Sequence, residues 1–148
     1  MGAKIVDGHQ SFKGTESETC LMRRVVIVED DPIVLHFLHR MLSIQGYDCL
    51  AFQQEQEALQ CLRAHRPALI ITGDPMPSMT IVQFLEHLYG HGDDAPIPVI
   101  LLTNKDDRHD VSRDEAKRLG VQTFLAKPLD YRKISVAVET ALPDRLRR

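Results

Sequence analysis

Polar side chains follow several apolar runs of this sequence directly, at points where β-strands would end. Glu29 and Asp30 follow the first run, Thr103 follows a later one, and Lys127 follows the last. Carboxylates, a hydroxyl and an ammonium are groups that bind ions or take part in acid–base chemistry. Each alone would be an ordinary solvated residue, but four such groups at strand ends form a candidate polar site.

The stretch 67–77 joins an apolar run to a glycine, an acid and two prolines. The run 69–71 has no alternating polar residues, which is typical of a strand buried on both faces. Proline cannot continue a ladder, so this strand must stop near Gly73 or Asp74. In open parallel sheets, ligands bind at the carboxyl ends of the strands. Gly73 and Asp74 therefore occupy a position where chemistry is expected.

Strand and helix patterns alternate five times along the chain. Strands are expected at 24–28, 48–52, 69 to 73 or 74, 98–102 and 121–126. The first helix should begin at Pro32 with Asp31 as its cap. Its apolar stripe reads as Ile33, Val34, Phe37, Leu38, Met41 and Leu42. The charged helix 107–119 has few apolar residues to anchor it. This alternation predicts an α/β fold, a doubly wound five-stranded parallel sheet with helices on both faces.

The length, composition and charge of the chain limit the kinds of protein that it could be. The chain has 148 residues, 43% hydrophobic and 26% charged, which suits one globular domain. A net charge of −3 gives no reason to expect nucleic-acid binding, and no segment reaches the length of a membrane span. Three scattered cysteines and no signal peptide favour a cytoplasmic location. We expect residues 1–22 to be a flexible leader, 23–142 the domain, and 143–148 the start of a linker or tail.

Four short stretches carry a family resemblance. They are Val-Val-Ile-Val-Glu29-Asp30-Asp31-Pro32, Met76-Pro77, Leu-Leu-Thr103 and Phe124-Leu-Ala-Lys127-Pro128. In this order and spacing they resemble the receiver (CheY-like) domain of bacterial response regulators, over roughly residues 23 to 142. The resemblance implies a flavodoxin-like fold and a part in two-component phosphorelay signalling. Members take a phosphoryl group from a histidine kinase onto an aspartate beside a bound Mg²⁺.

The resemblance assigns roles position by position. Glu29 and Asp30 match the acidic pair of the family, with Asp30 as the direct Mg²⁺ ligand; paired carboxylates and water supply the hard oxygen ligands that Mg²⁺ prefers. Thr103 matches the hydroxyl that contacts the phosphoryl group, and Lys127 matches the ammonium that neutralises it. Phe124 matches the aromatic residue that turns inward on activation.

The sequence departs from the family at the phosphoacceptor. The family places this aspartate four residues before the proline of the Met-Pro pair, where this chain has Gly73. Without a carboxylate no acyl phosphate can form there, and the Mg²⁺ site is weakened or lost. We expect Lys127 to pair directly with the acids at 29 and 30 instead. Asp74 is a substitute acceptor only if the strand end is distorted, because neighbouring strand residues point to opposite faces.

These observations predict an atypical receiver that is not an enzyme and acts through phosphorylation-independent protein–protein interaction. Partners would be a histidine kinase, an output domain or a dimer mate, held by helix 107–119, strand 121–126 and the last helix. Direct nucleic-acid binding and membrane association are not expected. Two alternatives stay open: a receiver phosphorylated at Asp74 with Mg²⁺, and a receiver-like sensor that binds a small molecule at Gly73.

Overall fold

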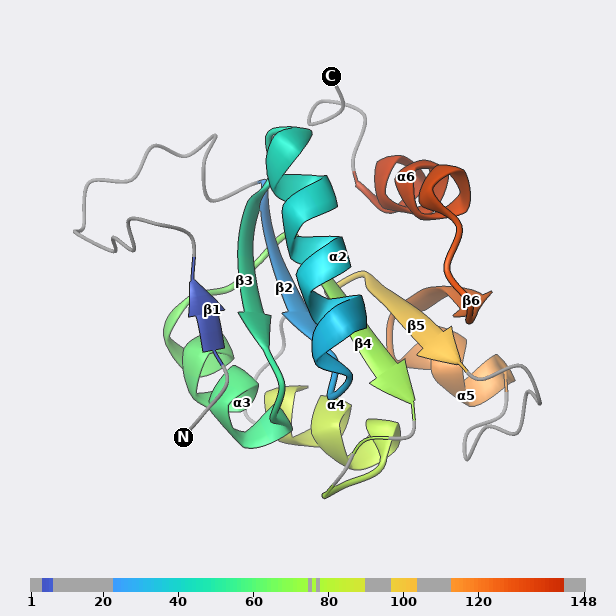
Figure 1. Ribbon diagram of the computed structural model, residues 1–148. Helices are drawn as coiled ribbons and strands as arrows, with labels where there is room; N and C mark the ends of the chain where they lie inside the picture. The colour runs from blue at the N-terminus through green and yellow to red at the C-terminus, as the bar shows by residue number, and fades with distance from the viewer. Residues whose placement is uncertain are drawn as a thin grey trace.

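The structure is a computed structural model that describes residues 4–6, 23–74, 76, 78–89, 97–103 and 113–142. Its strands are β1 (Lys4–Val6), β2 (Arg24–Val28), β3 (Asp48–Phe52), β4 (Leu69–Asp74), β5 (Val99–Thr103) and β6 (Val121–Ala126) (Figure 1). Its helices are α2 (Pro32–Ile44), α3 (Glu55–Ala64), α4 (Ile81–Tyr89), α5 (Arg113–Arg118) and α6 (Tyr131–Ala141). Within these residues, no helix has the length and apolar character needed to cross a bilayer.

One sheet of order β1-β3-β2-β4-β5-β6 forms the centre of the domain. Strands β2 to β6 pair in parallel, which confirms the predicted five-stranded parallel sheet. The sixth strand, β1, pairs antiparallel with the outer edge of β3. The expectation of a flexible leader over 1–22 is therefore wrong at Lys4–Val6, because backbone pairing with an open sheet edge needs no apolar pattern. The other residues of that segment lie outside the described ranges.

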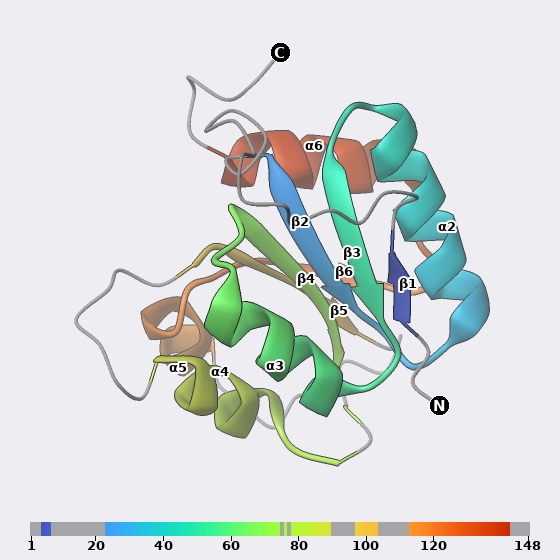
Figure 2. The ribbon, with the colours of Figure 1, turned by 90° about the vertical axis from the view of Figure 1, so that its left-hand side faces the viewer.

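Helices cover both faces of the sheet, as the alternation of patterns predicts (Figure 2). Helices α2 and α6 pack on one face, and α3, α4 and the end of α5 pack on the other. Every residue of β2 and β5 is buried, as expected for strands covered on both sides.

Helix α2 begins as predicted, and its buried arc coincides with the predicted stripe only in part. Asp31 caps the helix by accepting a hydrogen bond from the Ile33 amide at 2.9 Å, and Pro32 occupies its first turn. The buried residues are Leu35, Leu38, Met41 and Leu42. Ile33 and Phe37, which the predicted stripe included, are 79% and 38% exposed. Apolar residues surround much of this helix, so spacing alone does not decide which arc faces the sheet.

The charged helix expected over 107–119 is described only in part. Helix α5 covers Arg113–Arg118, and residues 104–112 lie outside the described ranges. Leu119, predicted as one of its few anchors, is buried at the end of this helix. The fourth predicted strand, 98–102, is shifted by one residue, because β5 runs from Val99 to Thr103.

Tyr89 ties the end of α4 to the start of β5. Its hydroxyl accepts a hydrogen bond from the Ile97 amide at 2.9 Å and donates one to the Ile97 carbonyl at 3.2 Å. Burial raises the pKa of the Tyr89 hydroxyl, and the bond from the Ile97 amide offsets this in part.

We expect Tyr89→Phe to lower the free energy of unfolding by about 1–3 kcal/mol at neutral pH. Because the pKa of Tyr89 is higher in the folded chain, its contribution is complete below the unfolded pKa and is lost as pH rises through the folded value. Urea unfolding from neutral to alkaline pH should therefore show the difference between wild type and variant shrinking with pH. A difference that stays constant into strong alkali would contradict this assignment.

Candidate functional site

The sheet brings the predicted polar residues to one edge. Pairing of β2 with β4 places Val28 opposite Thr72, one residue before Glu29 and Gly73 respectively. Pairing of β4 with β5 places Asp74 opposite Thr103, and β6 ends one residue before Lys127. The prediction that these strand ends meet at the carboxyl edge is confirmed.

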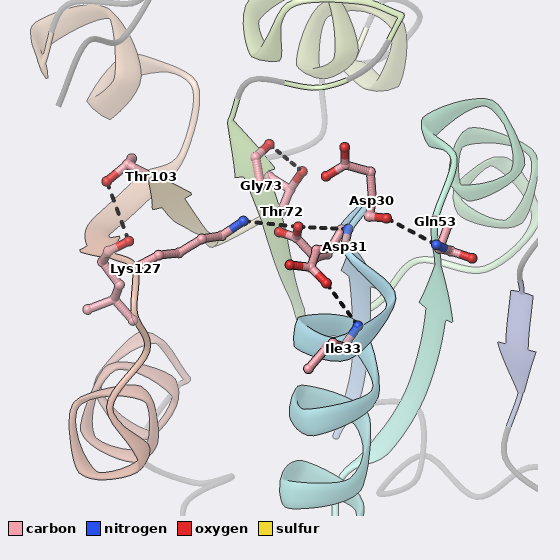
Figure 3. Close-up of polar contacts among 10 residues, drawn as sticks. Asp30, Asp31, Ile33, Gln53, Thr72, Gly73, Thr103 and Lys127 are labelled. Atoms are coloured by element: carbon pink, nitrogen blue, oxygen red, sulfur yellow. Dashed lines mark hydrogen bonds and ion pairs between the residues drawn. The ribbon is translucent and has the colours of Figure 1, made fainter. Parts of the chain in front are cut away.

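Glu29 is the buried centre of this edge, with 2% of its surface exposed. Its Oε2 accepts a hydrogen bond from Lys127 Nζ at 3.0 Å and another from the Asp31 amide at 3.0 Å. In Figure 3 the Lys127 side chain extends from the end of β6 toward the loop of Asp30 and Asp31. The expected ion pair of Lys127 with the acids is thus confirmed for Glu29. Asp30 is exposed and, among the described residues, makes no ion pair with Lys127.

The other oxygen of Glu29 lies where a side chain at position 73 would begin. A Cβ atom built on Gly73 would lie 2.5 Å from Glu29 Oε1, closer than nonbonded atoms approach. Gly73 is buried and has no unusual backbone angle, and a Cβ at this position would require the end of the Glu29 side chain to shift. Glu29 Oε1 is itself buried and has no hydrogen-bond partner among the described residues.

The electrostatics of Glu29 follow from its burial. Burial raises the pKa of its carboxyl group, and the Asp31 amide and the Lys127 ammonium lower it in part. The net pKa is above its ordinary value. The carboxylate therefore depends on Lys127 and on one backbone amide for its stabilisation.

Thr103 and Phe124 lie on neighbouring strands beside this pair. Thr103 is buried, and its hydroxyl donates a long hydrogen bond, 3.5 Å, to the Leu125 carbonyl. Its own carbonyl accepts a hydrogen bond from the Lys127 amide at 2.8 Å. Phe124 is half-buried and packs against the apolar cluster on the α3–α4 face. The side chain of Asp74 lies outside the described residues.

Two side chains that the sequence analysis passed over connect the loops of this edge. Gln53 donates from Nε2 to the Asp30 carbonyl at 3.0 Å. Glu55 is buried, with 1% exposed, and its Oε2 accepts from the Ser78 amide at 2.6 Å. Gln53 comes directly after β3, so the rule that marked Glu29 and Lys127, a polar residue just past a buried strand, would also have found it, whereas Glu55 is the first residue of α3.

The oxygen ligands at this edge can be compared with the needs of Mg²⁺. Asp30 offers an exposed carboxylate, but Glu29 Oε2 already accepts two hydrogen bonds. Position 73 supplies no side-chain oxygen, and the described residues contain no cluster of three His, Cys, Asp or Glu side chains arranged to hold a metal. Mg²⁺ usually binds through one or two carboxylates and several waters, so Asp30 and Glu29 are the side chains at this edge that would hold it.

Known proteins share both this sequence pattern and this fold. The chain is 27% identical over 121 residues to protein PilH of Pseudomonas aeruginosa, covering 82% of this chain and 98% of PilH. It is 32% identical over 107 residues to the Regulator of RpoS of Escherichia coli, covering 72% of this chain but only 31% of that protein.

A solved structure supports the same fold. It is the receiver domain of sensor histidine kinase PA1611 from P. aeruginosa, crystallised with a magnesium ion in its active-site cleft. The match has a TM-score of 0.67 and 19% identity, and it covers 80% of this chain and 95% of that one. Residues 25–139 match the response regulator receiver domain family. The chain therefore belongs to the response regulator receiver domain family of two-component signalling, with its CheY-like fold.

Proposed function

We propose that this chain is an atypical receiver that binds protein partners without forming an acyl phosphate. The observation that carries the proposal is the Glu29 carboxylate, which lies where a side chain at position 73 would begin and binds Lys127. On this proposal Gly73 stands at the phosphoacceptor position, and Glu29 replaces the missing carboxylate as the counter-ion of Lys127. Thr103 and Phe124 would then keep one arrangement, or change it only when a partner binds.

Weak Mg²⁺ binding follows from the same arrangement. A magnesium ion at Glu29 and Asp30 would have to compete with the Lys127 ammonium, which already binds one Glu29 oxygen at 3.0 Å. Like charges disfavour each other at short range, so a bound cation would require Lys127 to move away. The magnesium-bound receiver of PA1611 supports the location of such a site but not its strength in this chain.

Partner binding is proposed to use the described surface of α5, β6 and α6. Strand β6 is an edge strand whose residues 122–126 are all at least partly exposed. Edge strands and half-buried apolar residues are common in interfaces between proteins. A kinase, an output domain or a second receiver are the partner classes that we propose for this surface.

The mass of the protein after treatment with a small phosphodonor tests the proposal. In a competent receiver, a carboxylate oxygen attacks the phosphorus of acetyl phosphate, a P–O bond forms, and acetate leaves. We expect intact-mass spectrometry with acetyl phosphate and Mg²⁺ to show no added phosphoryl group on the wild-type chain. The variant Gly73→Asp is the positive control for the reagent and the scaffold.

Phosphorylation of the wild-type chain would overturn the proposal. If the added mass disappeared in Asp74→Asn, Asp74 would be the acceptor and the chain a competent receiver. An adduct that survives Asp74→Asn would place the acceptor elsewhere and would equally contradict phosphorylation-independent action.

A further inference from the structure

Exposed large apolar side chains gather on two helices of this domain. Among the described residues they are Ile33, Phe37 and Ile44 on α2, and Tyr131 and Val136 on α6. The ends of the two helices are joined, because Gln45 donates from Nε2 to Tyr131 Oη and Ser135 Oγ, both at 3.1 Å. A monomeric domain rarely keeps several large apolar side chains exposed on one surface without a partner for them.

Four exposed residues of α2 form a straight seam along the helix. Ile33, Phe37, Arg40 and Ile44 follow each other at spacings of four, three and four residues, which keeps them on one line of an α-helix. The core-facing residues Leu35, Leu38, Met41 and Leu42 lie on another arc. The seam extends over about 16 Å of helix. Its spacing is that of a helix that pairs with another helix.

The seam begins and ends with an isoleucine, and its two middle residues are Phe37 and Arg40. When two copies of α2 pair antiparallel about a two-fold axis, Ile33 meets Ile44 of the second copy, and Phe37 meets Arg40. Each guanidinium would then lie over an aromatic ring rather than against the other arginine, which is an attractive contact. No acidic residue lies within Pro32–Ile44 to compete for Arg40.

We infer that α2 is a self-association surface through which two copies of this chain pair antiparallel along Ile33, Phe37, Arg40 and Ile44. The seam involves one short helix, so the interface is smaller than that of a stable dimer and the association is weak and concentration-dependent. This inference assigns a second copy to a different surface, helix α2, and does not depend on the absence of phosphorylation. The mass measurement above and the association measurement below can therefore fail separately.

Complementary charges on the two ends of the seam test the pairing directly. Ile33 and Ile44 are 79% and 74% exposed, so charged residues at either position should leave the fold intact. In sedimentation equilibrium of the full chain from micromolar to millimolar, we expect Ile33→Glu and Ile44→Lys each to weaken dimerisation by about tenfold or more. The double variant should recover most of the loss, because each introduced carboxylate then faces an introduced ammonium of the second copy.

Positions 33 and 44 lie about 16 Å apart in one helix, so the introduced charges cannot pair within a single copy. The matched control is Gln60→Glu, at an exposed position of α3 on the opposite face of the sheet, which should leave dimerisation unchanged. Far-UV circular dichroism would check that each variant is folded. A wild-type chain that stays monomeric throughout, or a double variant as weak as the single ones, would overturn the inference.

Discussion

Replacing Gly73 with aspartate should produce a receiver that accepts phosphate and binds Mg²⁺, at the cost of stability when Mg²⁺ is absent. The new carboxylate would stand at the edge that already holds Asp30, Thr103 and Lys127. With Mg²⁺ and acetyl phosphate, intact mass should change from no adduct to a largely phosphorylated chain. Mg²⁺ affinity, measured by calorimetry, should rise at the same time, since the metal gains a third carboxylate.

The stability loss follows from Glu29. A Cβ at position 73 would meet Glu29 Oε1 at 2.5 Å, so the Glu29 carboxylate must turn away, and a further negative charge joins the same buried edge. We expect Gly73→Asp to lower the free energy of unfolding by about 1–3 kcal/mol without Mg²⁺, measured by urea denaturation. Added Mg²⁺ should restore part of this loss because it binds the folded chain.

A double-mutant cycle tests whether Glu29 has taken over as the counter-ion of Lys127. Glu29→Ala alone removes the carboxylate that Lys127 binds. Because the Lys127 side chain is 26% exposed and water can solvate its charge, the free energy of unfolding should fall by only about 1 kcal/mol. Glu29→Ala combined with Gly73→Asp moves one carboxylate from the residue after β2 to β4. The free energy of unfolding of this double variant should exceed the value expected from adding the two single effects by about 0.5–3 kcal/mol.

Gly73→Ala is the matched control, because it adds the Cβ without a charge and so separates steric conflict from repulsion. Strictly additive effects of Glu29→Ala and Gly73→Asp would show that the two positions do not share one space. Failure of Gly73→Asp to gain either Mg²⁺ affinity or a phosphoryl group would contradict the assignment of position 73.

Removing Asp48 should give the largest loss of stability among simple substitutions at ion pairs. Arg24 is fully buried at the amino end of β2, and its Nε donates to Asp48 Oδ2 of β3 at 3.1 Å. A buried cation without its acid is strongly unfavourable, so Asp48→Ala should cost about 3 kcal/mol in urea denaturation. Arg24→Met together with Asp48→Ala should recover most of that loss, because neither charge of this pair then remains.

The exposed pair on α5 provides the comparison. Arg118 and Glu115 lie 3.6 Å apart with side chains 66% and 39% exposed, so Glu115→Ala should change the free energy of unfolding by less than about 0.5 kcal/mol. Equal effects of Asp48→Ala and Glu115→Ala would mean that burial does not control the strength of these pairs.

Local pattern in the sequence determined the strands, the α2 cap and the edge at which polar residues meet. Short runs of apolar residues without polar alternation are typical of strands covered on both faces, and β2, β4 and β5 lie where those runs are. Because parallel strands place their carboxyl ends on one side, the sequence alone assigns Glu29, Thr103 and Lys127 to one site. The ion pair of Lys127 was expected with both acids from the missing carboxylate at position 73, and it is present with Glu29.

Only the tertiary structure decided which atoms meet within that edge. The sequence showed that position 73 lacks a carboxylate, but not that Glu29 Oε1 lies in the space that a side chain would need. It did not show that Lys4–Val6 pair with β3, or that Ile33 and Phe37 face away from the core. These features depend on contacts between distant segments and on how each helix turns against the sheet, which residue spacing alone leaves undetermined.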